Sequence, residues 1–93
     1  MAEKKKSKKR VKFELEASPK SEVYVAGSFN GWNPSDKRLK YSKSNGIHSV
    51  SMLLDRDREF EYKYVVDGYW CLDPNNDQVV ANRFGSMNSV LKT

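Results

Sequence analysis

The chain has 93 residues, of which 38% are hydrophobic and 12% aromatic, and its formal net charge is +5. This length supports one domain with a single modest core, and the aromatic-rich composition favours a thin two-layer fold over a large helical core. We expect no membrane span, because no apolar run approaches the roughly 20 residues required, and no secretory signal.

The positive charge is concentrated at the N-terminus. Residues 1–12 contain seven basic residues and one acidic residue, so the rest of the chain is close to neutral. Residues 1–10 are expected to form a disordered basic tail, followed by one domain over residues 11–93. A solvated tail or linker is the simplest interpretation; an anionic partner, a membrane surface and a nuclear signal are alternatives. Nucleic-acid binding is not expected, because the basic residues do not spread over a folded face.

Every segment after the tail favours a strand or a turn. Alternating apolar and polar residues predict strands at Val11–Glu16 and Glu22–Ala26, followed by a loop at Gly27–Asp36. Ile47–Leu54 follows an Asn-Gly turn signal, although its inward face is ambiguous, and Met87–Leu91 is the last predicted strand. About seven short strands at this spacing predict an all-β fold, an immunoglobulin-like (early-set) antiparallel β-sandwich.

The strongest local signal is an Asp-Gly pair at residues 67–68, between the aromatic and β-branched runs Glu59–Val66 and Tyr69–Leu72. A two-residue Asp-Gly connection predicts a β-hairpin, in which both turn residues adopt positive φ. The short loop also fixes the register, so Val65 is expected opposite Trp70.

Side-chain alternation gives this hairpin two different faces. The predicted core face carries Phe60, Tyr62, Tyr64, Val66, Tyr69 and Cys71. The other face combines Trp70 with Lys63, about 7 Å away on a diagonal. A flat aromatic ring beside a cation with several donors suits a ligand that is apolar on its faces and polar at its rim, as sugars are.

Four blocks of the sequence occur in the same order and spacing as in a known family. They are residues 23–32 (VYVAGSFNGW), residues 62–70 (YKYVVDGYW), Asp73-Pro74 and residues 85–88 (GSMN). Together they resemble the glycogen-binding domain of the AMP-activated protein kinase β subunit, a member of carbohydrate-binding module family 48. The resemblance covers roughly residues 11–92 and implies non-catalytic binding of α-1,4-linked glucans.

The resemblance also implies roles for individual residues. The family's two tryptophans, here Trp32 and Trp70, stack on successive glucose rings. Its lysine in the strand before the Asp-Gly turn, here Lys63, bonds sugar hydroxyls, and its asparagine in the last strand, here Asn88, bonds hydroxyls through the amide.

Two further family positions are changed in this chain. Phe84 and Ser86 replace the family's leucine and threonine, and the bulkier Phe84 is expected to reshape the groove. If residues 84–88 are extended, the period of two places Phe84, Ser86 and Asn88 on one face. The amide of Asn88 then offers two donors and one acceptor to adjacent hydroxyls of a sugar ring.

Each of these side chains also has a simpler interpretation. A tryptophan in a β-sandwich is often part of the core, and Lys63 could be a solvated strand lysine. Tyr24, Tyr41 and Tyr69 are expected to pack in the core or on the surface.

Catalysis is not expected, and neither is a metal or a cofactor. Glycoside hydrolysis needs two carboxylates across a cleft, whereas the acidic residues here are explained by turns or solvated faces. His48, the only histidine, lacks a nucleophile in a recognisable setting. The single cysteine excludes an internal disulfide and a multi-cysteine zinc site, and it fits a reducing, cytoplasmic location.

Two other classes stay open beside a freestanding binding module. One is a regulatory or scaffold domain that brings a glycogen-metabolising enzyme or a kinase to the glucan. The other is a degenerate module that has lost its ligand, which the presence of the two tryptophans, the lysine and the asparagine argues against. The expected partner is an α-glucan polysaccharide or oligosaccharide, and a monomer is expected.

Overall fold

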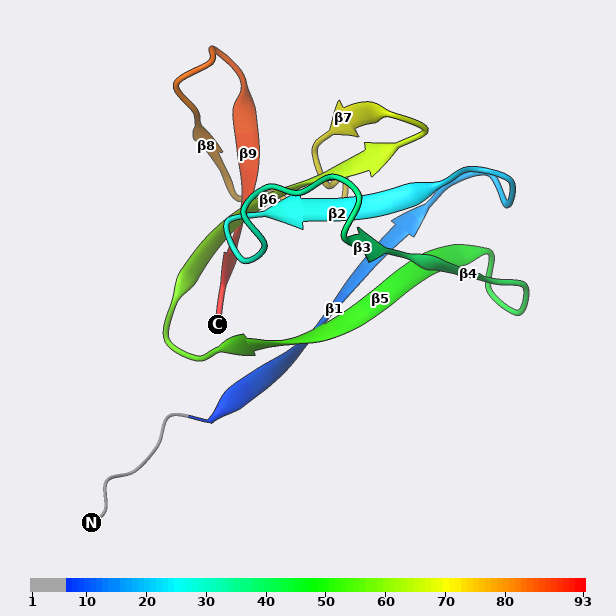
Figure 1. Ribbon diagram of the computed structural model, residues 1–93, viewed down its shortest axis with the longest axis horizontal. Helices are drawn as coiled ribbons and strands as arrows, with labels where there is room; N and C mark the ends of the chain where they lie inside the picture. Colours follow the sequence, from blue (N-terminus) through cyan, green and yellow to red (C-terminus); the bar gives the residue numbers. More distant parts are fainter. Residues whose placement is uncertain (1–6) are drawn as a thin grey trace.

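The computed structural model describes residues 7–93, which form nine antiparallel strands (Figure 1). The strands are β1 (Lys8–Glu16), β2 (Val23–Gly27), β3 (Lys37–Arg38), β4 (Lys40–Ser42), β5 (Ile47–Asp55), β6 (Glu59–Val66), β7 (Tyr69–Cys71), β8 (Val79–Ala81) and β9 (Met87–Lys92). The expected all-β class is confirmed. Strands β3, β4 and β8 were not predicted individually, because they have only two or three residues, too few for an alternation to be recognised.

The strands make two sheets that pack face to face as a β-sandwich. One sheet has the order β1-β5-β4, and the other has the order β3-β2-β6-β9-β8, with β7 also paired to β6. In the larger sheet, the edge of β6 that faces away from β2 is shared by two partners. Glu59–Tyr62 pairs with β9 and Tyr64–Val66 pairs with β7, so the sheet divides at Lys63, where β7 and β9 diverge (Figure 1).

Alternation in β1, β2 and β6 produces the core between the sheets. The buried cluster comprises Val11, Phe13, Leu15, Val23, Val25, Leu39, Leu54, Tyr62 and Tyr64. The ring of Phe13 in β1 lies edge-on to Tyr62 in β6, with 5.2 Å between the centroids. The Tyr64 hydroxyl donates to the backbone oxygen of Glu14 at 3.0 Å, which joins the two sheets by a hydrogen bond as well as by packing.

The face of β5 that the sequence left ambiguous is settled by its pairing with β1. His48, Val50 and Met52 lie opposite Leu15, Phe13 and Val11, the three inward side chains of β1. His48 is buried, and its Nε2 lies 2.9 Å from the backbone oxygen of Ser18. The histidine is therefore a structural residue of the core.

The expected boundary between tail and domain, after residue 10, lies too far along the chain. Residues 8–10 belong to β1, where their backbones pair with residues 53–55 of β5. The Lys8 ammonium also lies 2.6 Å from the Asp55 carboxylate. A ladder of backbone hydrogen bonds tolerates charged side chains on a solvent face, so the absence of apolar residues did not prevent a strand here. Residues 1–6 of the predicted tail lie outside the described part of the chain.

The hairpin at residues 67–68 has the predicted turn and register. Asp67 and Gly68 have φ of 51° and 87°, and Val65 lies opposite Trp70. The prediction that Tyr69 belongs to the core face is wrong, because its side chain is 78% exposed. Strand β7 has only three residues, at the end of the sandwich, and alternation alone cannot tell whether the opposite sheet reaches that far.

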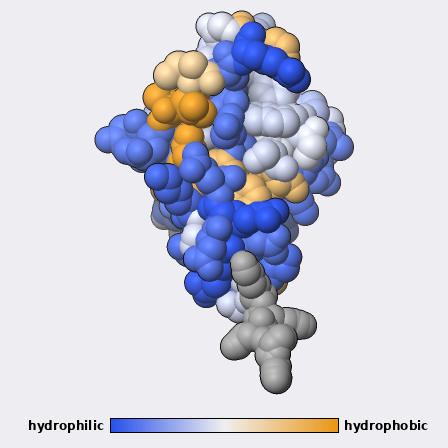
Figure 2. Space-filling view, turned by 90° about the vertical axis from the view of Figure 1, so that its left-hand side faces the viewer, coloured by the Kyte–Doolittle hydropathy of each residue, from blue (hydrophilic) through white to orange (hydrophobic). Residues whose placement is uncertain are grey.

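Apolar surface remains at the end of the molecule where β8 and β9 lie (Figure 2). The exposed apolar side chains of these two strands are Val79, Val80 and Met87. Among the described residues, β8 pairs with β9 alone and is therefore an edge strand.

Candidate functional site

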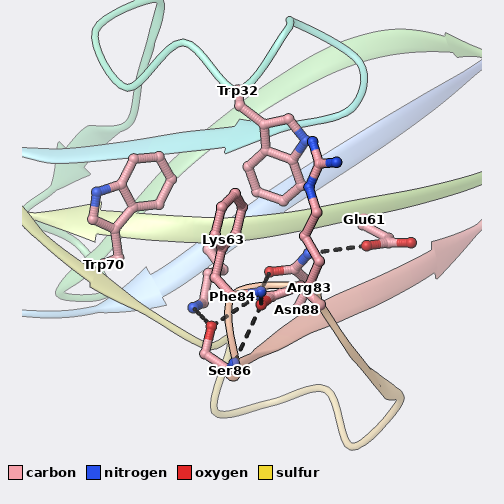
Figure 3. Close-up of a pocket in the computed structure, with 9 residues that line it drawn as sticks. Trp32, Glu61, Lys63, Trp70, Arg83, Phe84, Ser86 and Asn88 are labelled. Carbon is pink, nitrogen blue, oxygen red and sulfur yellow. Dashed lines mark hydrogen bonds between the residues drawn. The ribbon is translucent and has the colours of Figure 1, made fainter.

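An open groove of about 680 Å³ lies on the outer face of the larger sheet, at the point where the sheet divides. The side chains that line it come from the β2–β3 loop, from β6 and β7, and from the β8–β9 connection with the start of β9 (Figure 3). Six of them are the residues named from the sequence, namely Trp32, Lys63, Trp70, Phe84, Ser86 and Asn88. The structure thus brings all six predicted site residues together.

Trp32 is held by a tightly bonded loop that follows β2. The side-chain oxygen of Asn30 accepts from the backbone N–H of Gly27 at 3.1 Å, and the N–H of Trp32 donates back to the oxygen of Gly27 at 2.9 Å. Gly31 and Trp32 both have positive φ, 67° and 61°. Such a conformation is unfavourable for a bulky residue and persists only where surrounding bonds enforce it, which is common at functional sites.

Gly27 is required at the start of this loop for a steric reason. A Cβ at this position would collide with the backbone oxygen of Glu61 and with the ring of Phe29. The close approach lets the N–H of Ser28 donate to Glu61 at 2.9 Å, which ties the loop to β6. The Gly-Ser-Phe-Asn-Gly-Trp segment is therefore a compact loop that holds one indole over the sheet.

Trp70 reaches the groove from the short strand β7. Its side chain remains 46% exposed, although it stands opposite the buried Val65. The indoles of Trp32 and Trp70 are 6.4 Å apart between centroids and inclined by 45°. Two tilted aromatic faces, that of the exposed Trp70 and that of the half-buried Trp32, therefore lie side by side at the groove (Figure 3).

The segment before β9 is a turn, so the condition that residues 84–88 are extended holds only for Met87 and Asn88, which belong to β9. The N–H of Gly85 donates to the backbone oxygen of Asn82 at 3.3 Å, and Gly85 has a φ of +84°. The turn leaves Phe84 at its tip, 83% exposed, with the guanidinium carbon of Arg83 5.5 Å from the ring centroid. A glycine that adopts positive φ easily and an Asn that bonds nearby N–H groups make a turn here more stable than a strand.

Polar groups line the same groove as the aromatic residues. The Lys63 ammonium donates to the Ser86 hydroxyl at 3.4 Å, and the Asn88 amide donates to Glu61 Oε1 at 2.9 Å (Figure 3). Asn88 is only 6% exposed, whereas Ser86 is open to solvent. The groove therefore combines aromatic faces with an ammonium, a hydroxyl, an amide and a carboxylate.

Three lining residues were not named from the sequence: Glu61, Asn82 and Arg83. A signal for Glu61 was present, because it lies two positions before Lys63 and so shares its face of β6. A signal for Asn82 was also present, because an Asn three positions before a Gly is typical of a turn. No local pattern marked Arg83.

The acidic residues outside the groove have structural roles where the structure describes their contacts. Asp73 accepts from the Tyr62 hydroxyl at 2.7 Å and from the N–H of Asn75 at 2.9 Å. The backbone N–H of Glu22 donates to Asp67 and holds the pKa of that carboxyl below its usual value. Within residues 7–93 no group of three or more His, Cys, Asp or Glu is arranged to hold a metal ion, and no helix is long and apolar enough to cross a membrane.

Known proteins resemble this chain over most of its length. The family model described as the glycogen recognition site of AMP-activated protein kinase matches residues 10–93. The β-1 subunit of 5′-AMP-activated protein kinase from Sus scrofa is 35% identical over 71 residues, which cover 76% of this chain and 53% of that protein. The rice protein FLOURY ENDOSPERM 6, chloroplastic (Oryza sativa subsp. japonica), is 38% identical over 90 residues, which cover 97% of this chain and 16% of the rice protein.

A plant relative of Arabidopsis thaliana, PTST homolog 2, chloroplastic, is 43% identical over 54 residues, 58% of this chain and 10% of that protein. The chain thus spans about half of the pig subunit and much less of the plant relatives. The single cysteine led to the expectation of a cytoplasmic location. That expectation is wrong, because two relatives carry the word chloroplastic in their names.

The match over residues 10–93 includes the loop of Trp32, the hairpin of Trp70 and the turn before Asn88. These are the three segments that line the groove. The chain belongs to the family described as the glycogen recognition site of AMP-activated protein kinase.

Proposed function

We propose that this chain is a non-catalytic binding module for α-1,4-linked glucans such as glycogen, starch, maltooligosaccharides and cyclodextrins. Trp32 and Trp70 stack on successive glucose rings, and Lys63, Ser86 and Asn88 bond the hydroxyls. Phe84 closes one side of the groove against the sugar. The observation that carries the proposal is the pair of indoles that line one groove, 6.4 Å apart and inclined by 45°, beside the polar groups of that groove.

The inclination of the two indoles favours a curved ligand. An indole covers the apolar C–H face of a pyranose while the ring hydroxyls remain at its edge. Consecutive rings of an α-1,4-glucan turn relative to one another, so two faces at 45° meet two consecutive rings. A β-1,4-glucan is a flat ribbon and would contact only one of these faces well.

The polar groups beside the indoles complement sugar hydroxyls, which both donate and accept. Lys63 offers up to three N–H donors and Glu61 is an acceptor, so neighbouring hydroxyls find both kinds of partner. Affinity is expected to be modest, because a short oligosaccharide buries far less than the ~1,200 Å² of a standard protein interface.

Hydrolysis of the glucan is not part of the proposal. A glycosidase needs two carboxylates about 5–9.5 Å apart on either side of the bond. The described residues that line the groove include one carboxylate, Glu61, and that carboxylate accepts from the Asn88 amide. Its position next to Asn88 fits hydroxyl recognition better than acid catalysis.

A second candidate is a regulatory or scaffold role, in which the glucan site localises a partner enzyme or kinase. It is supported by the family match and by the kinase subunit among the relatives, of which this chain covers 53%. The exposed apolar side chains of β8 and β9 offer a surface for such a partner. Both roles rest on the same groove. The monomeric state and the early-set immunoglobulin-like class of the sandwich remain predictions.

The proposal is tested by comparing two oligosaccharides of similar length. Isothermal titration calorimetry with maltoheptaose is expected to give saturable binding, and titration with cellohexaose is expected to give no heat above dilution. Equal affinity for the two sugars would contradict the role of the inclined indoles. Absence of binding to either sugar would favour the degenerate module.

A further inference from the structure

We infer that Asn82 is a positioning residue of the groove, which acts through Asn88 by fixing the orientation of its amide. The inference rests on the proposed glucan site and explains how one of its polar side chains is held in place. Asn82, Asn88 and Glu61 all line the groove and form one chain of hydrogen bonds, of which Figure 3 shows the bond between Asn88 and Glu61. The chain joins the turn before β9 to β9 itself and then to β6.

The orientation of Asn82 is set by the backbone of its own turn. Its Oδ1 accepts from the N–H of Phe84 at 2.9 Å and from the N–H of Ser86 at 3.2 Å. Backbone N–H groups only donate, so the oxygen of the amide must face them. The nitrogen of Asn82 is therefore turned the other way, toward Ser86 Oγ at 2.8 Å and Asn88 Oδ1 at 3.1 Å.

The orientation of Asn88 is set from both of its ends. Its Oδ1 accepts from the nitrogen of Asn82, and its Nδ2 donates to Glu61 Oε1 at 2.9 Å. A carboxylate only accepts, so a reversed amide would place two acceptors in contact at Glu61 and two donors in contact at Asn82. The described bonds thus permit one orientation of the Asn88 amide.

This arrangement matters for the ligand because Asn88 is almost fully buried. At 6% exposure it has little freedom to turn toward an arriving sugar, and two of its hydrogen-bonding sites are already occupied. One N–H and one lone pair of the amide remain, in positions that Asn82 and Glu61 determine. Binding then requires no reordering of this side chain, which reduces the entropic cost of association.

The substitution Asn82→Asp tests this device, because Asp has nearly the same shape as Asn. The carboxylate still accepts from the N–H groups of Phe84 and Ser86, so the turn is retained. It no longer donates to Asn88, and either orientation of the Asn88 amide then leaves two acceptors in contact. We expect the affinity for maltoheptaose to fall about tenfold, the scale of losing one well-placed hydrogen bond.

The double variant Asn82→Asp/Glu61→Gln provides a rescue. The amide of Asn88 can reverse, donate to the carboxylate at position 82 and accept from the new amide at position 61, so a single orientation is restored. Sugar hydroxyls donate and accept, so we expect most of the lost affinity to return. The double variant has the net charge of the wild type, and Asn45→Asp, in an exposed turn away from the groove, controls for the charge of the single variant.

The side-chain amide of Asn88 gives a readout that needs no ligand. Its protons are expected to exchange slowly with water in the wild type and in the double variant, and quickly in Asn82→Asp. If Asn82 merely stiffened its turn, the substitution Glu61→Gln would restore neither the affinity nor the slow exchange of the Asn88 amide, because Glu61 lies on β6 and not in the turn.

The outcomes separate this inference from the proposed function. A wild type that binds maltoheptaose, together with an Asn82→Asp variant of equal affinity, overturns the inference and leaves the function standing. A single variant that the change at Glu61 does not rescue also overturns it. A wild type that binds no glucan overturns the function, and fast exchange of its Asn88 amide would then overturn the inference as well.

Discussion

Replacing Trp70 with Ala is expected to lower the affinity for maltoheptaose about a hundredfold while the fold is retained. The truncation removes roughly 100 Å² of sugar contact, about 2.5 kcal/mol by area. Stacking geometry adds about 0.5–1.5 kcal/mol by analogy with aromatic pairs. A total near 3 kcal/mol corresponds to about a hundredfold in Kd, which places a weak ligand beyond practical measurement.

The stability of the same variant distinguishes a ligand platform from a core residue. Because the Trp70 side chain is 46% exposed, its loss should lower the free energy of unfolding by no more than about 1 kcal/mol. A buried tryptophan would cost about 3–5 kcal/mol. The matched control is Tyr69→Ala, which removes a neighbouring ring that is 78% exposed and does not line the groove.

Titration calorimetry and thermal unfolding measure the two quantities on the same samples. The control is expected to bind maltoheptaose like the wild type. An affinity that survives Trp70→Ala, or a large loss of stability, would show that Trp70 is not a platform for the sugar.

Alkaline pH is expected to destabilise the protein through two tyrosines of the core. Burial, reinforced for Tyr62 by its hydrogen bond to Asp73, raises the pKa of that phenol well above 10, and burial does the same for Tyr64. The two side chains are only 4% and 1% exposed. A raised pKa means that the folded protein retains protons that the unfolded chain releases above pH 10, so stability is complete below that pH and falls above it.

The size of this effect follows from proton linkage. At pH 11 an unfolded tyrosine with a pKa near 10 gains roughly 1.4 kcal/mol by ionising. Two such phenols therefore lower the free energy of unfolding by roughly 2.8 kcal/mol between pH 7 and pH 11. Guanidinium denaturation at the two pH values measures the difference.

The double variant Tyr62→Phe/Tyr64→Phe is the control for the alkaline prediction. It is less stable at neutral pH, because it lacks the hydroxyl bonds to Asp73 and to Glu14. Its further loss at pH 11 should be smaller than that of the wild type. The comparison cancels other groups, including the Cys71 thiol, whose pKa burial also raises. Equal losses in the two proteins would exclude the tyrosines as the cause.

The parts of the fold that the sequence predicted are those with strong local rules. The Asp-Gly turn at residues 67–68 requires positive φ and sets a register, and the structure has both. The start of β1 was missed because its pairing with β5 depends on backbone groups that carry no sequence signal. The exposure of Tyr69 was missed because alternation gives the face of a strand and not the extent of the layer opposite.

The residues of the groove also fall into those that the sequence predicted and those that it missed. Trp32, Lys63, Trp70 and Asn88 were identified because the family motifs contain them in fixed positions. Glu61 and Asn82 were missed because their roles depend on bonds to Asn88 across different elements. A contact between residues 27 positions apart is set by how the strands pair, which no local pattern records.

The central claim is that the groove lined by Trp32 and Trp70 binds an α-1,4-glucan. An NMR titration of ¹⁵N-labelled protein with β-cyclodextrin tests it most directly, because both indole N–H groups and the Asn88 amide give separate signals. Saturable shifts of these three signals, with little change at the opposite sheet of β1, β4 and β5, are the expected result. Signals of the groove that remain unshifted at high ligand concentration, or shifts confined to the opposite sheet, would contradict the claim.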